Sequence, residues 1–556
     1  MSFHLFSKLF KRRGRRRLRR IMRGYRFLKN SQSLGRIAEV NRTLTIRPLD
    51  INEKRFSKFL FGEGREQAEV VCRQYLLCRI AGLNLNRALL HTLGKLGSPV
   101  VYYLPPEWRR IIRMQGFKVA SVRTALRWNA FVGMMLAYGA LKIVKIFLNG
   151  IIASRNRSRQ QLGSYVYFDG LTIGTLPQPG RDGRSHDIIT WYMQWPGRIR
   201  VIDKLCHGVM GAEPRAVNGT PIVAIPAPLR PLTRFVSLAG FLAWGIGAVL
   251  IATWDFLRGR WWHALLLNQA ALAAQVRIQS PERLARDYLF HNSGWIYRPL
   301  WTFEAEKRGS RITFYFYSTN CEAFKQPEGY SPLPYGWEAM NWPLYLVWDE
   351  YQADFVRRAV GETANISVVG PIWFHCSTME MPAISGRGVA VFDITPTRSS
   401  LYQTLGMDFE FYVPQICITF LRDIQSAAKD SGYLMLWKRK RKLKKESSFA
   451  HPSYLSSAER LSESENVIAV DPDISAYRVI EASACVVSMP FTSTALIARE
   501  LGKPSCYYDP TGLIQKEDRA AHGIEIISGV EELTRWLKGL PVESRLSKTD
   551  ELAPVV

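Results

Sequence analysis

The chain has 556 residues, of which 47 % are hydrophobic, so it is too long for one ordinary core and too apolar for a disordered protein. Its 75 Lys and Arg residues outnumber the 47 Asp and Glu residues, and the net charge of +28 predicts an anionic partner: a phosphorylated ligand, an anionic lipid or a nucleic acid. The eight cysteines show no CxxC pair or zinc spacing, and there is no HExxH motif or Walker loop, so we expect buried free thiols and no metal site.

Residues 1–30 form a strongly basic segment with twelve Lys and Arg and no Asp or Glu. Apolar side chains are interleaved with the charges, which is typical of a basic helix lying on an anionic membrane surface. The segment lacks the apolar core and cleavage site of a signal peptide. We predict a membrane-surface region over residues 1–60. A nucleic-acid arm is the alternative, but the aromatic residues elsewhere do not alternate with a basic groove, so we expect no nucleic-acid partner.

Residues 235–254 are a run of 20 residues without a charge. A helix of that length measures about 30 Å and could cross a bilayer. Spanning helices carry positive charge mainly on one side, whereas this run is flanked on both sides by Arg230, Arg234, Arg258 and Arg260. We therefore predict a monotopic or re-entrant helix over 235–257 on the cytoplasmic face of the inner membrane. A true span and a buried core helix are the alternatives, and residues 131–152 are a candidate companion helix.

Short apolar runs alternate with helical patterns along most of the chain. These runs are rich in Val, Ile, Phe and Tyr and do not alternate with polar residues, as expected for parallel strands buried on both faces. Helical patterns such as 420–429 and 494–501 lie between them. The predicted strands are 100–104, 165–168, 188–192, 222–225, 312–317, 344–348, 366–369, 389–392, 434–437, 467–470, 485–487 and 505–508.

This alternation predicts an α/β chain with two facing, doubly wound Rossmann-like lobes, which is a GT-B-like architecture. The segment 381–388 is short of periodic apolar residues and rich in turn residues, so we predict a linker there. It would separate an amino-terminal, acceptor-side lobe (61–380), which contains the apolar segment 235–257, from a carboxyl-terminal, nucleotide-donor lobe (389–545).

A hydroxyl-rich turn follows the strand pattern at 485–487 and directly precedes the helical pattern at 494–501. Backbone N–H groups at a helix start lack intrahelical partners, and the helix dipole adds partial positive charge, so the turn is a candidate phosphate seat. Simple helix capping is the other interpretation of its hydroxyl groups. The predicted nucleotide-binding residues of this turn are Ser488, Pro490, Phe491, Thr492, Ser493 and Thr494.

A second anion-favouring loop follows the strand pattern at 434–437. Lys and Arg at a strand end suit phosphate binding, although they also suit a solvated loop or a membrane-facing patch. Pro452 restricts the backbone of His451 and so fixes where the imidazole points. Asp393 ends the first strand of its lobe, where doubly wound folds place ligand residues. The predicted residues are Asp393, Thr395, Lys438, Arg439, Lys440, His451 and Pro452.

Four carboxylates are candidates for the catalytic group. A glycosyl transfer needs a carboxylate that takes a proton from the acceptor hydroxyl or attacks the anomeric carbon. Glu304 is the first candidate, and it would share one face with Glu306 on a strand but not on a helix. Asp349 and Glu350 are the other two. A structural ion pair or a helix cap is the alternative for each.

Six sequence blocks resemble a bacterial group, the polysaccharide biosynthesis PFTS motif proteins. The blocks are 299–310, 316–320, 347–351, 369–372, 391–396 and 490–493, and the resemblance is good over roughly 290–515. It implies a role in envelope polysaccharide assembly. More distantly, the Lys-rich strand end, the His-Pro pair and the Ser/Thr pair are similar to GT-B transferases that use CMP-linked sialic acid or Kdo. That similarity implies CMP contacts for His451, Pro452, Ser493 and Thr494.

Together these features predict a membrane-associated glycosyltransferase of bacterial surface polysaccharide (capsule or O-antigen) biosynthesis. It would transfer a sugar from a nucleotide donor, possibly CMP-linked, to a lipid-linked or glycan acceptor, with no cofactor besides that co-substrate. The expected partners are the donor, the acceptor and an anionic membrane surface. A CDP-polyol phosphotransferase and a non-catalytic polysaccharide assembly protein are the alternatives.

Overall fold

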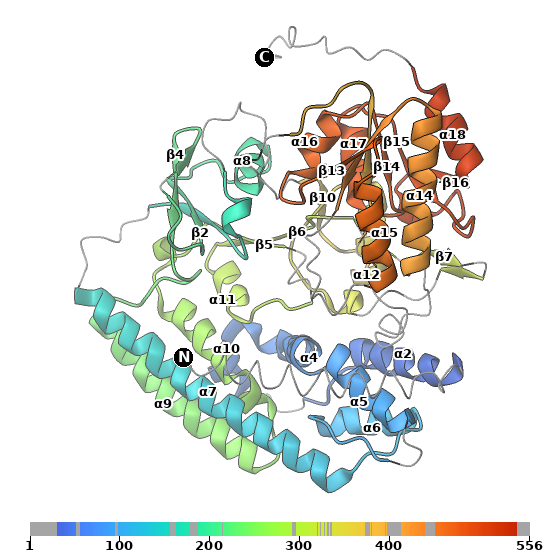
Figure 1. Ribbon diagram of the computed structural model, residues 1–556. Coiled ribbons are helices and arrows are strands. Elements are labelled where there is room, and N and C mark those ends of the chain that lie inside the picture. Colours follow the sequence, from blue (N-terminus) through green and yellow to red (C-terminus); the bar gives the residue numbers. More distant parts are fainter. Residues whose placement is uncertain are drawn as a thin grey trace.

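The computed structural model describes residues 31–541 except 52–55, 95–97, 156–162, 178–186, 214, 292–295, 320, 323, 327, 331–332, 334–335, 373–378, 380, 395, 397–412 and 440–450. The described chain forms two α/β lobes and a layer of helices against the first of them (Figure 1). The basic residues 1–30 and the predicted site residues Thr395 and Lys440 lie outside the described residues.

The carboxyl-terminal lobe is built on a six-stranded, fully parallel sheet with the order β13-β12-β11-β14-β15-β16. This is the order of a doubly wound fold: the chain starts in the middle, runs to one edge, then returns to the middle and runs to the other edge. The strands are β11 (Gly388–Phe392), β12 (Leu434–Lys438), β13 (Val467–Val470), β14 (Cys485–Ser488), β15 (Ser505–Asp509) and β16 (Glu525–Ser528).

Helices cover both faces of this sheet, because right-handed crossovers running in opposite directions from the middle put their helices on opposite sides. The group α14, α15 and α18 and the pair α16 and α17 each pack together. Their bounds are α14 (Pro414–Asp430), α15 (Pro452–Ser462), α16 (Ala476–Glu481), α17 (Ser493–Glu500) and α18 (Val530–Gly539), with the short helix η7 (Arg519–Ala521). The continuous apolar pattern of the strands follows from this double cover: all five residues of β11 are buried.

The amino-terminal lobe has an eight-stranded sheet with the order β10-β9-β6-β5-β1-β2-β4-β3. All its pairings are parallel except that of the edge strand β3. Its chain also starts in the middle, at β1, and the strand order reverses between β1 and β5. The strands are β1 (Tyr165–Phe168), β2 (Lys204–His207), β3 (Arg215–Val217), β4 (Thr220–Ala224), β5 (Asp287–His291), β6 (Arg311–Tyr315), β9 (Tyr345–Val347) and β10 (Ile366–Val368).

Shorter elements complete this lobe. The hairpin of β7 (Lys325–Gln326) and β8 (Gly329–Tyr330) reaches toward the other lobe. The helices are α8 (Ile188–Gln194), α11 (Trp301–Lys307) and α12 (Glu350–Val360), with the single turns η3 (Ile173–Thr175), η4 (Pro281–Arg283) and η6 (Trp337–Ala339).

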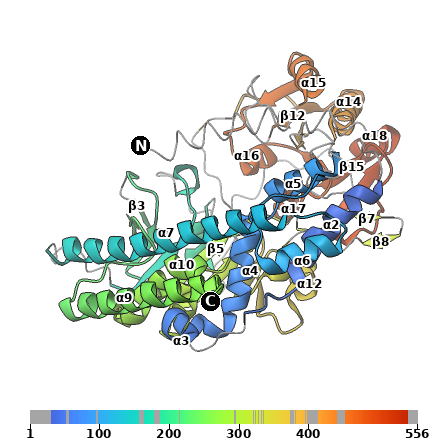
Figure 2. The same ribbon diagram turned by 90° about the horizontal axis from the view of Figure 1, so that it is seen from below.

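A helical base lies against the amino-terminal lobe, and Figure 2 shows its long helices α7, α9 and α10 side by side. The base consists of α2 (Ser31–Ile46), α3 (Ser57–Phe61), η1 (Gly62–Gln67), α4 (Ala68–Arg79), α5 (Leu83–Gly94), α6 (Pro106–Met114), α7 (Ser121–Arg155), α9 (Phe235–Leu257) and α10 (Trp262–Ile278). Helix α10 is buried on nearly all sides, because α7 and α9 cover it.

Helices α7 and α9 are antiparallel and pack closely through glycines. A Cβ added to Gly150 would lie 2.4 Å from Leu238 Cδ2, and one added to Gly245 would lie 2.6 Å from Ile143 Cγ2. Small residues of this kind allow close helix contact. Both helices are long and apolar enough to cross a membrane, judged by length and composition alone. Their outer faces expose Met134, Tyr138, Leu141, Val144, Leu148, Ile152, Phe235, Val236, Leu242, Ile246, Leu250, Trp254 and Leu257.

The predicted α/β class with parallel sheets is confirmed, whereas two strand predictions are wrong. Residues 188–192 lie in helix α8, although their Ile, Thr, Trp and Tyr residues favour strands. Asp187 caps that helix by accepting a hydrogen bond from Thr190 N at 2.8 Å, and the local apolar pattern gave no sign of the cap. Within 100–104 the structure has only an isolated bridge between Val100 and Val119. Strands β2, β3, β5, β7, β8 and β16 were not predicted.

The expected burial of the cysteines holds for most of those described. Cys72, Cys206, Cys321, Cys417, Cys485 and Cys506 are buried free thiols, while Cys78 is exposed. Segment 381–387, in the predicted linker, has no regular structure, and β11 begins at Gly388. The predicted domain boundaries stay predictions.

Candidate functional site

The strand order of the carboxyl-terminal lobe brings three predicted site residues to one edge of its sheet. In register, Phe392 lies opposite Lys438 on one side and Ser488 on the other. Asp393 therefore leaves β11 between the ends of β12 and β14, where the strand order reverses. Open α/β sheets bind ligands in the crevice outside such a reversal point. We call this crevice the donor crevice.

Asp393 is the most buried charged group of the donor crevice, with 5 % of its surface exposed. The Tyr454 hydroxyl, from α15, donates a hydrogen bond to its carboxylate. Burial raises the pKa of Asp393 to about 7, although Tyr454 and the nearby Arg439 favour the ionised form. The carboxyl group thus keeps its proton to a much higher pH than an exposed Asp does.

Two cationic side chains, Lys438 and Arg439, lie at the end of β12, which pairs with β11. Lys438 is 8 % exposed, and its Nζ donates to the carbonyl of Pro472 at 3.1 Å. Burial lowers the pKa of Lys438, and the carboxylates of Asp471, Asp473 and Asp393 partly oppose this. The Arg439 guanidinium lies 5.2 Å from the centre of the Trp437 ring, and its Nε has no hydrogen-bond partner among the described residues.

His451 is the N-cap of α15, and its Nδ1 accepts a hydrogen bond from Ser453 N at 3.2 Å. A neutral imidazole that accepts at Nδ1 carries its proton at Nε2, so Nε2–H is a donor for a ligand. Tyr454, which contacts Asp393, lies three residues later on the same helix, so His451 stands within one turn of that contact.

The turn at 489–494 carries a cluster of hydroxyl groups at the start of α17. Ser488 Oγ lies 2.8 Å from Thr494 Oγ1, and Thr492 Oγ1 lies 3.2 Å from the same atom. The Thr492 hydroxyl also donates to the carbonyl of Met489 at 2.8 Å. These contacts place the predicted hydroxyl groups together beside the end of β14, directly next to Asp393 in the sheet.

The same turn also joins the two lobes, which the sequence did not predict. Phe491 is 4 % exposed and has a φ of 62°, a left-handed conformation that costs a bulky residue energy. Its ring centre lies 4.5 Å from that of Phe324 in the amino-terminal lobe. Ser493 Oγ accepts a hydrogen bond from Thr319 N at 3.1 Å, after the end of β6. Ser493 is thus positioned by the amino-terminal lobe as well as by the turn.

The amino-terminal lobe has its own reversal-point crevice, between β1 and β5. Asp169 follows β1, and its backbone N–H donates to Leu289 O on β5 at 2.9 Å. His291 ends β5, and a Cβ on Gly170 would lie 2.3 Å from His291 Nε2. Burial raises the pKa of Asp169 and lowers that of His291, although a backbone contact with Gly170 opposes the latter shift. We call this crevice the acceptor crevice.

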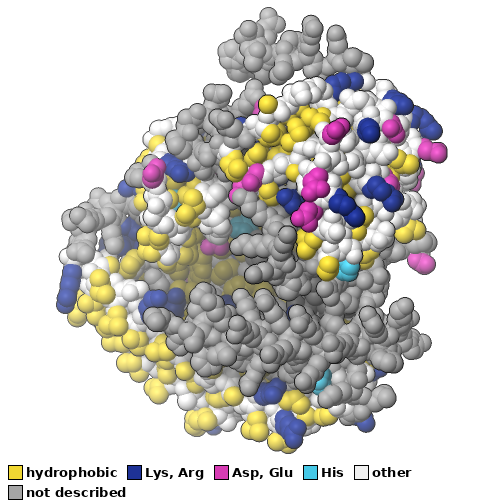
Figure 3. Space-filling view, in the orientation of Figure 1, with side chains coloured by type: hydrophobic (Ala, Val, Ile, Leu, Met, Phe, Trp, Pro, Cys, Tyr) yellow, Lys and Arg dark blue, Asp and Glu magenta, His cyan; other side chains and the backbone are white. Residues whose placement is uncertain are grey.

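Asp169 and His291 were missed by the sequence analysis. The predicted strand 165–168 ends one residue before Asp169, and the rule that singled out Asp393 would also have selected it. His291 ends a strand that was not predicted. Figure 3 shows a hollow in the surface between the two lobes, with hydrophobic side chains and a histidine side chain visible inside it.

Glu304 and Glu306 lie on helix α11, not on a strand, and their side chains meet different partners. Glu304 is 3 % exposed; its Oε1 accepts from Glu63 N at 3.1 Å and lies 3.7 Å from Arg277 Nη1. Gly62 makes room for it, because a Cβ there would lie 1.7 Å from Oε1. Glu306 forms an ion pair with the buried Arg298. The contacts of Glu304 join α11 to the helical base, whereas the Glu306–Arg298 pair lies within the amino-terminal lobe. The catalytic roles of both residues stay predictions.

Glu304 can be tested with a pair of variants that separates structure from catalysis. Glu304→Ala removes the acceptor of the Glu63 N–H and the carboxylate that pairs with Arg277, so we expect a loss of about 2 kcal/mol of stability. Glu304→Gln keeps a hydrogen-bond acceptor, and we expect near-parental thermal stability and turnover. A Gln variant that is stable but loses turnover would instead support the catalytic role.

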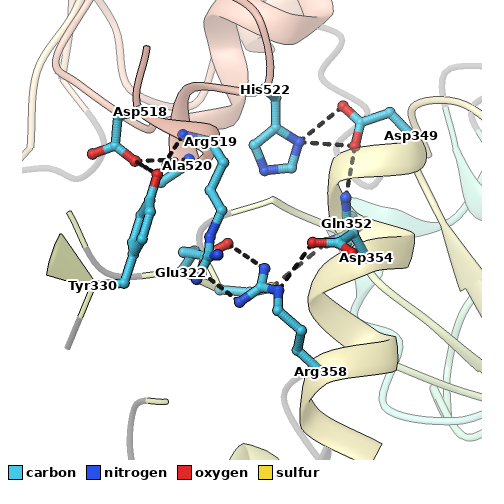
Figure 4. A network of polar contacts seen from close by, with 11 residues as sticks. Glu322, Tyr330, Asp349, Gln352, Asp354, Arg358, Asp518, Arg519, Ala520 and His522 are labelled. Carbon is cyan, nitrogen blue, oxygen red and sulfur yellow. Dashed lines mark hydrogen bonds and ion pairs between the residues drawn. The ribbon is translucent and has the colours of Figure 1, made fainter. Parts of the chain in front are cut away.

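Asp349 is the N-cap of helix α12, which begins at Glu350, and Asp349 contacts the other lobe (Figure 4). Asp349 caps α12 through Gln352 N at 3.0 Å, and both its oxygens lie 2.8 Å from His522 Nδ1. Arg499 lies 3.6 Å from the same carboxylate. Glu350 is exposed and pairs weakly with Arg357 at 3.7 Å. Asp349 is thus part of the contact between lobes.

Further ion pairs extend this contact (Figure 4). Glu322 of the amino-terminal lobe is bound by Arg358 of α12 and by Arg519 of the other lobe, with N–O distances of 2.7–2.9 Å. Asp518 accepts hydrogen bonds from Lys325 N at 2.8 Å and from the Tyr330 hydroxyl at 3.1 Å. These contacts fix one side of the two lobes relative to each other.

Comparison with known proteins gives one family match. Residues 244–537, just over half of the chain, match the family model described as polysaccharide biosynthesis PFTS motif protein. A comparison with curated proteins found no match.

The fold is also similar, at a low level, to solved structures, three of which follow. Arabidopsis thaliana UGT89C1 has 11 % identity and a TM-score of 0.34, and the match covers 68 % of this chain and 90 % of that one. The glycotransferase of kitacinnamycin has 12 % identity and a TM-score of 0.33, with coverage of 68 % and 91 %. A UDP-forming α,α-trehalose-phosphate synthase from Burkholderia xenovorans, in complex with glucose-6-phosphate, has 10 % identity and a TM-score of 0.31, with coverage of 68 % and 93 %. Likenesses at this level carry no argument about function.

Proposed function

The chain belongs to the polysaccharide biosynthesis PFTS motif family, and from this premise we propose that it is a membrane-associated glycosyltransferase of bacterial surface polysaccharide (capsule or O-antigen) biosynthesis. Its donor would be a nucleotide sugar, with CMP-linked sugars as the first to test, and its acceptor a lipid-linked or free glycan. The family prediction made from the six sequence blocks is confirmed; the activity, the donor and the acceptor are proposals.

The proposal rests on one observation. Side chains and N–H groups that can bind an anion lie together in the donor crevice, where the strand order of a doubly wound sheet reverses. Lys438, Arg439 and the Nε2–H of His451 are donors from β12 and α15. Helix α17 begins beside them with Thr492 and Thr494. Cationic and N–H donors of this kind suit the phosphate of a nucleotide.

We place the base that deprotonates the acceptor hydroxyl in the acceptor crevice of the amino-terminal lobe. In glycosyl transfer the acceptor hydroxyl loses its proton, its oxygen bonds to the anomeric carbon, and the nucleotide phosphate leaves with the bonding electrons. A base near neutrality is suited to take that proton. We assign this role to His291, which ends β5 against Gly170 and whose pKa is lowered by burial, which favours the neutral imidazole.

The proposed membrane association rests on α7 and α9. Each helix packs one face against α10 and leaves an apolar outer face exposed, so the pair forms one wide apolar surface. Soluble monomers rarely expose such a surface. Helices that share a protein core along one side fit an in-plane, monotopic arrangement on the cytoplasmic membrane face better than separate spans. We call this surface the apolar face.

The nucleotide proposal is tested by a thermal-shift screen of the full chain with CMP, CDP, UDP and GDP, followed by titration with the best ligand. His451→Asn keeps an N-cap acceptor but loses the Nε2–H donor, whereas His451→Ala loses both. We expect both variants to bind the nucleotide about tenfold more weakly. Only the Ala variant should also lose about 1 kcal/mol of stability.

If His451→Asn binds like the parent, His451 is only a helix cap and the donor site lies elsewhere. Absence of stabilisation by all four nucleotides would favour the non-catalytic assembly role. Release of free sugar or its transfer to a glycan by the purified protein, with the nucleotide as second product, would establish the enzyme.

A further inference from the structure

A cavity of about 140 Å³ lies at the start of α9, on the opposite edge of the amino-terminal sheet from the acceptor crevice. It is formed by the beginning of α9, the end of α10 and the turn η4. Its lining includes Arg234, Ser237, Gln279, Arg283 and Arg308. We call it the arginine pocket.

The described lining of the arginine pocket holds three arginines and no Asp or Glu. Within the described residues, no carboxylate forms an ion pair with Arg234, Arg283 or Arg308. Arg283 is held by Thr233 Oγ1 at 2.9 Å and Pro231 O at 3.1 Å. Burial and then the neighbouring Arg230 and Arg234 lower the pKa of Arg283, which reflects a positive local potential.

Two buried polar atoms that line the pocket have no partner among the described residues. Gln279 is 3 % exposed, and its Oε1 has no hydrogen-bond partner; the Nε of Arg283 has none either. Buried polar atoms are normally paired, so these atoms indicate a ligand or ordered water in the cavity. The first turn of α9 adds backbone N–H groups without intrahelical partners.

The surroundings of the pocket are apolar. Phe235 and Val236 follow Arg234 directly and are 81 % and 82 % exposed, at the edge of the apolar face. A second, more open hollow of about 570 Å³ lies further along α9; Trp244 and Phe59 line it, and it shares Ile278 with the arginine pocket. A ligand with an anionic head and long apolar chains fits this pair of hollows, whereas a free anion would use only the first.

We propose that the arginine pocket binds the phosphate of an anionic membrane lipid whose acyl chains lie along α9. Arg234 and Arg283 would hold the phosphate, and Gln279 Oε1 would accept from a headgroup hydroxyl. The proposal rests on the membrane association proposed above but not on the transferase activity. Basic residues in general attract the protein to an anionic membrane. The arginine pocket would add a specific lipid-binding site, and this site would set the orientation of the lobes on the membrane surface.

The test measures binding of the full chain to phosphatidylcholine vesicles that contain phosphatidic acid or, at the same surface charge, oleate. We expect about tenfold tighter binding to the phosphatidic acid vesicles, since a phosphate has more acceptor oxygens than a carboxylate and can bind Arg234 and Arg283 at once. Arg234→Gln and Arg234→Lys should both remove this selectivity, because Lys keeps the charge but not the two-pronged geometry. Arg234 is exposed, so neither variant should disturb folding.

Arg258→Gln is the matched control, since Arg258 is an exposed arginine at the other end of the same helix, 4.2 Å above the Trp254 ring. It should weaken binding to both vesicle types equally, by up to about fivefold. Equal binding of the parent to both vesicle types, or loss of selectivity in Arg258→Gln, would overturn the proposal. So would displacement from phosphatidic acid vesicles by water-soluble glycerol phosphate at low concentration, which would assign the pocket to a soluble phosphate.

The nucleotide titration, run on the same Arg234 variants, should match the parent. A parent that binds no nucleotide but selects phosphatidic acid would leave the lipid site standing and remove the transferase proposal.

Discussion

Asp393→Asn is expected to make the protein more stable than the parent at pH 8. It should also reduce the dependence of the free energy of unfolding on pH between pH 4 and pH 7. Asp393 has its pKa raised from 3.8 to about 7 in the folded chain. Between these values the folded state holds a proton that the unfolded state has lost, so the parent loses stability as pH rises through this window. About three pKa units correspond to up to about 4 kcal/mol.

Urea denaturation of parent and variant at pH 5 and pH 8 measures this effect. Asp430→Asn, at the exposed end of α14 in the same lobe, is the matched control and should follow the parent. The Asn variant should also keep its nucleotide affinity from pH 6 to pH 8, whereas the parent should bind more weakly as Asp393 ionises beside the phosphate. If the free energy of unfolding and the nucleotide affinity depend on pH in the same way in the parent and in Asp393→Asn, the titration of Asp393 controls neither of them.

Phe491→Ala is expected to cost about 3–5 kcal/mol and to loosen the contact between the lobes. The ring is buried and touches Phe324 at 4.5 Å and Tyr507 at 5.7 Å, as ring-centre distances. Phe324 belongs to the amino-terminal lobe but packs in the core of the carboxyl-terminal lobe. Hydrogen exchange should therefore speed up in 316–319 as well as around 488–496.

Phe420→Ala is the control, because Phe420 is fully buried in α14 and should destabilise the same lobe without changing exchange in 316–319. Phe491→Gly gives a second check: with φ at 62°, Gly should be at least as stable as Ala here, the reverse of the usual order. Unchanged exchange in 316–319 after loss of the Phe491 ring would show that the turn does not hold the lobes together.

The turn at 489–494 has several roles at once. The turn has to present Thr492 and Thr494 to the donor crevice, place Phe491 against Phe324, and offer the Ser493 hydroxyl to Thr319. A ligand bound beside α17 would thus touch a segment that also fixes the amino-terminal lobe.

Local pattern was enough to predict those features that depend on burial of a short segment. The runs at 389–392 and 434–437 are strands whose two faces are covered, so they are apolar throughout, and the edge strand at 467–470 keeps the same apolar pattern with Ala469 exposed. The helix over 235–257 followed from a long apolar run, and the position of Asp393 followed from the end of a strand.

Contacts between distant segments were decided only by the tertiary structure. The sequence left Glu304 open as a catalytic carboxylate or a member of an ion pair, and only the approach of Gly62 and Arg277 shows where it is held. The pairing of β1 with β5, 120 residues later in the chain, creates the acceptor crevice. Apolar periodicity indicates that a segment is buried, but it does not indicate which other segment covers it, because many partners would bury the same area equally well. The partner is determined only by the strand order and the side-chain contacts of the folded chain.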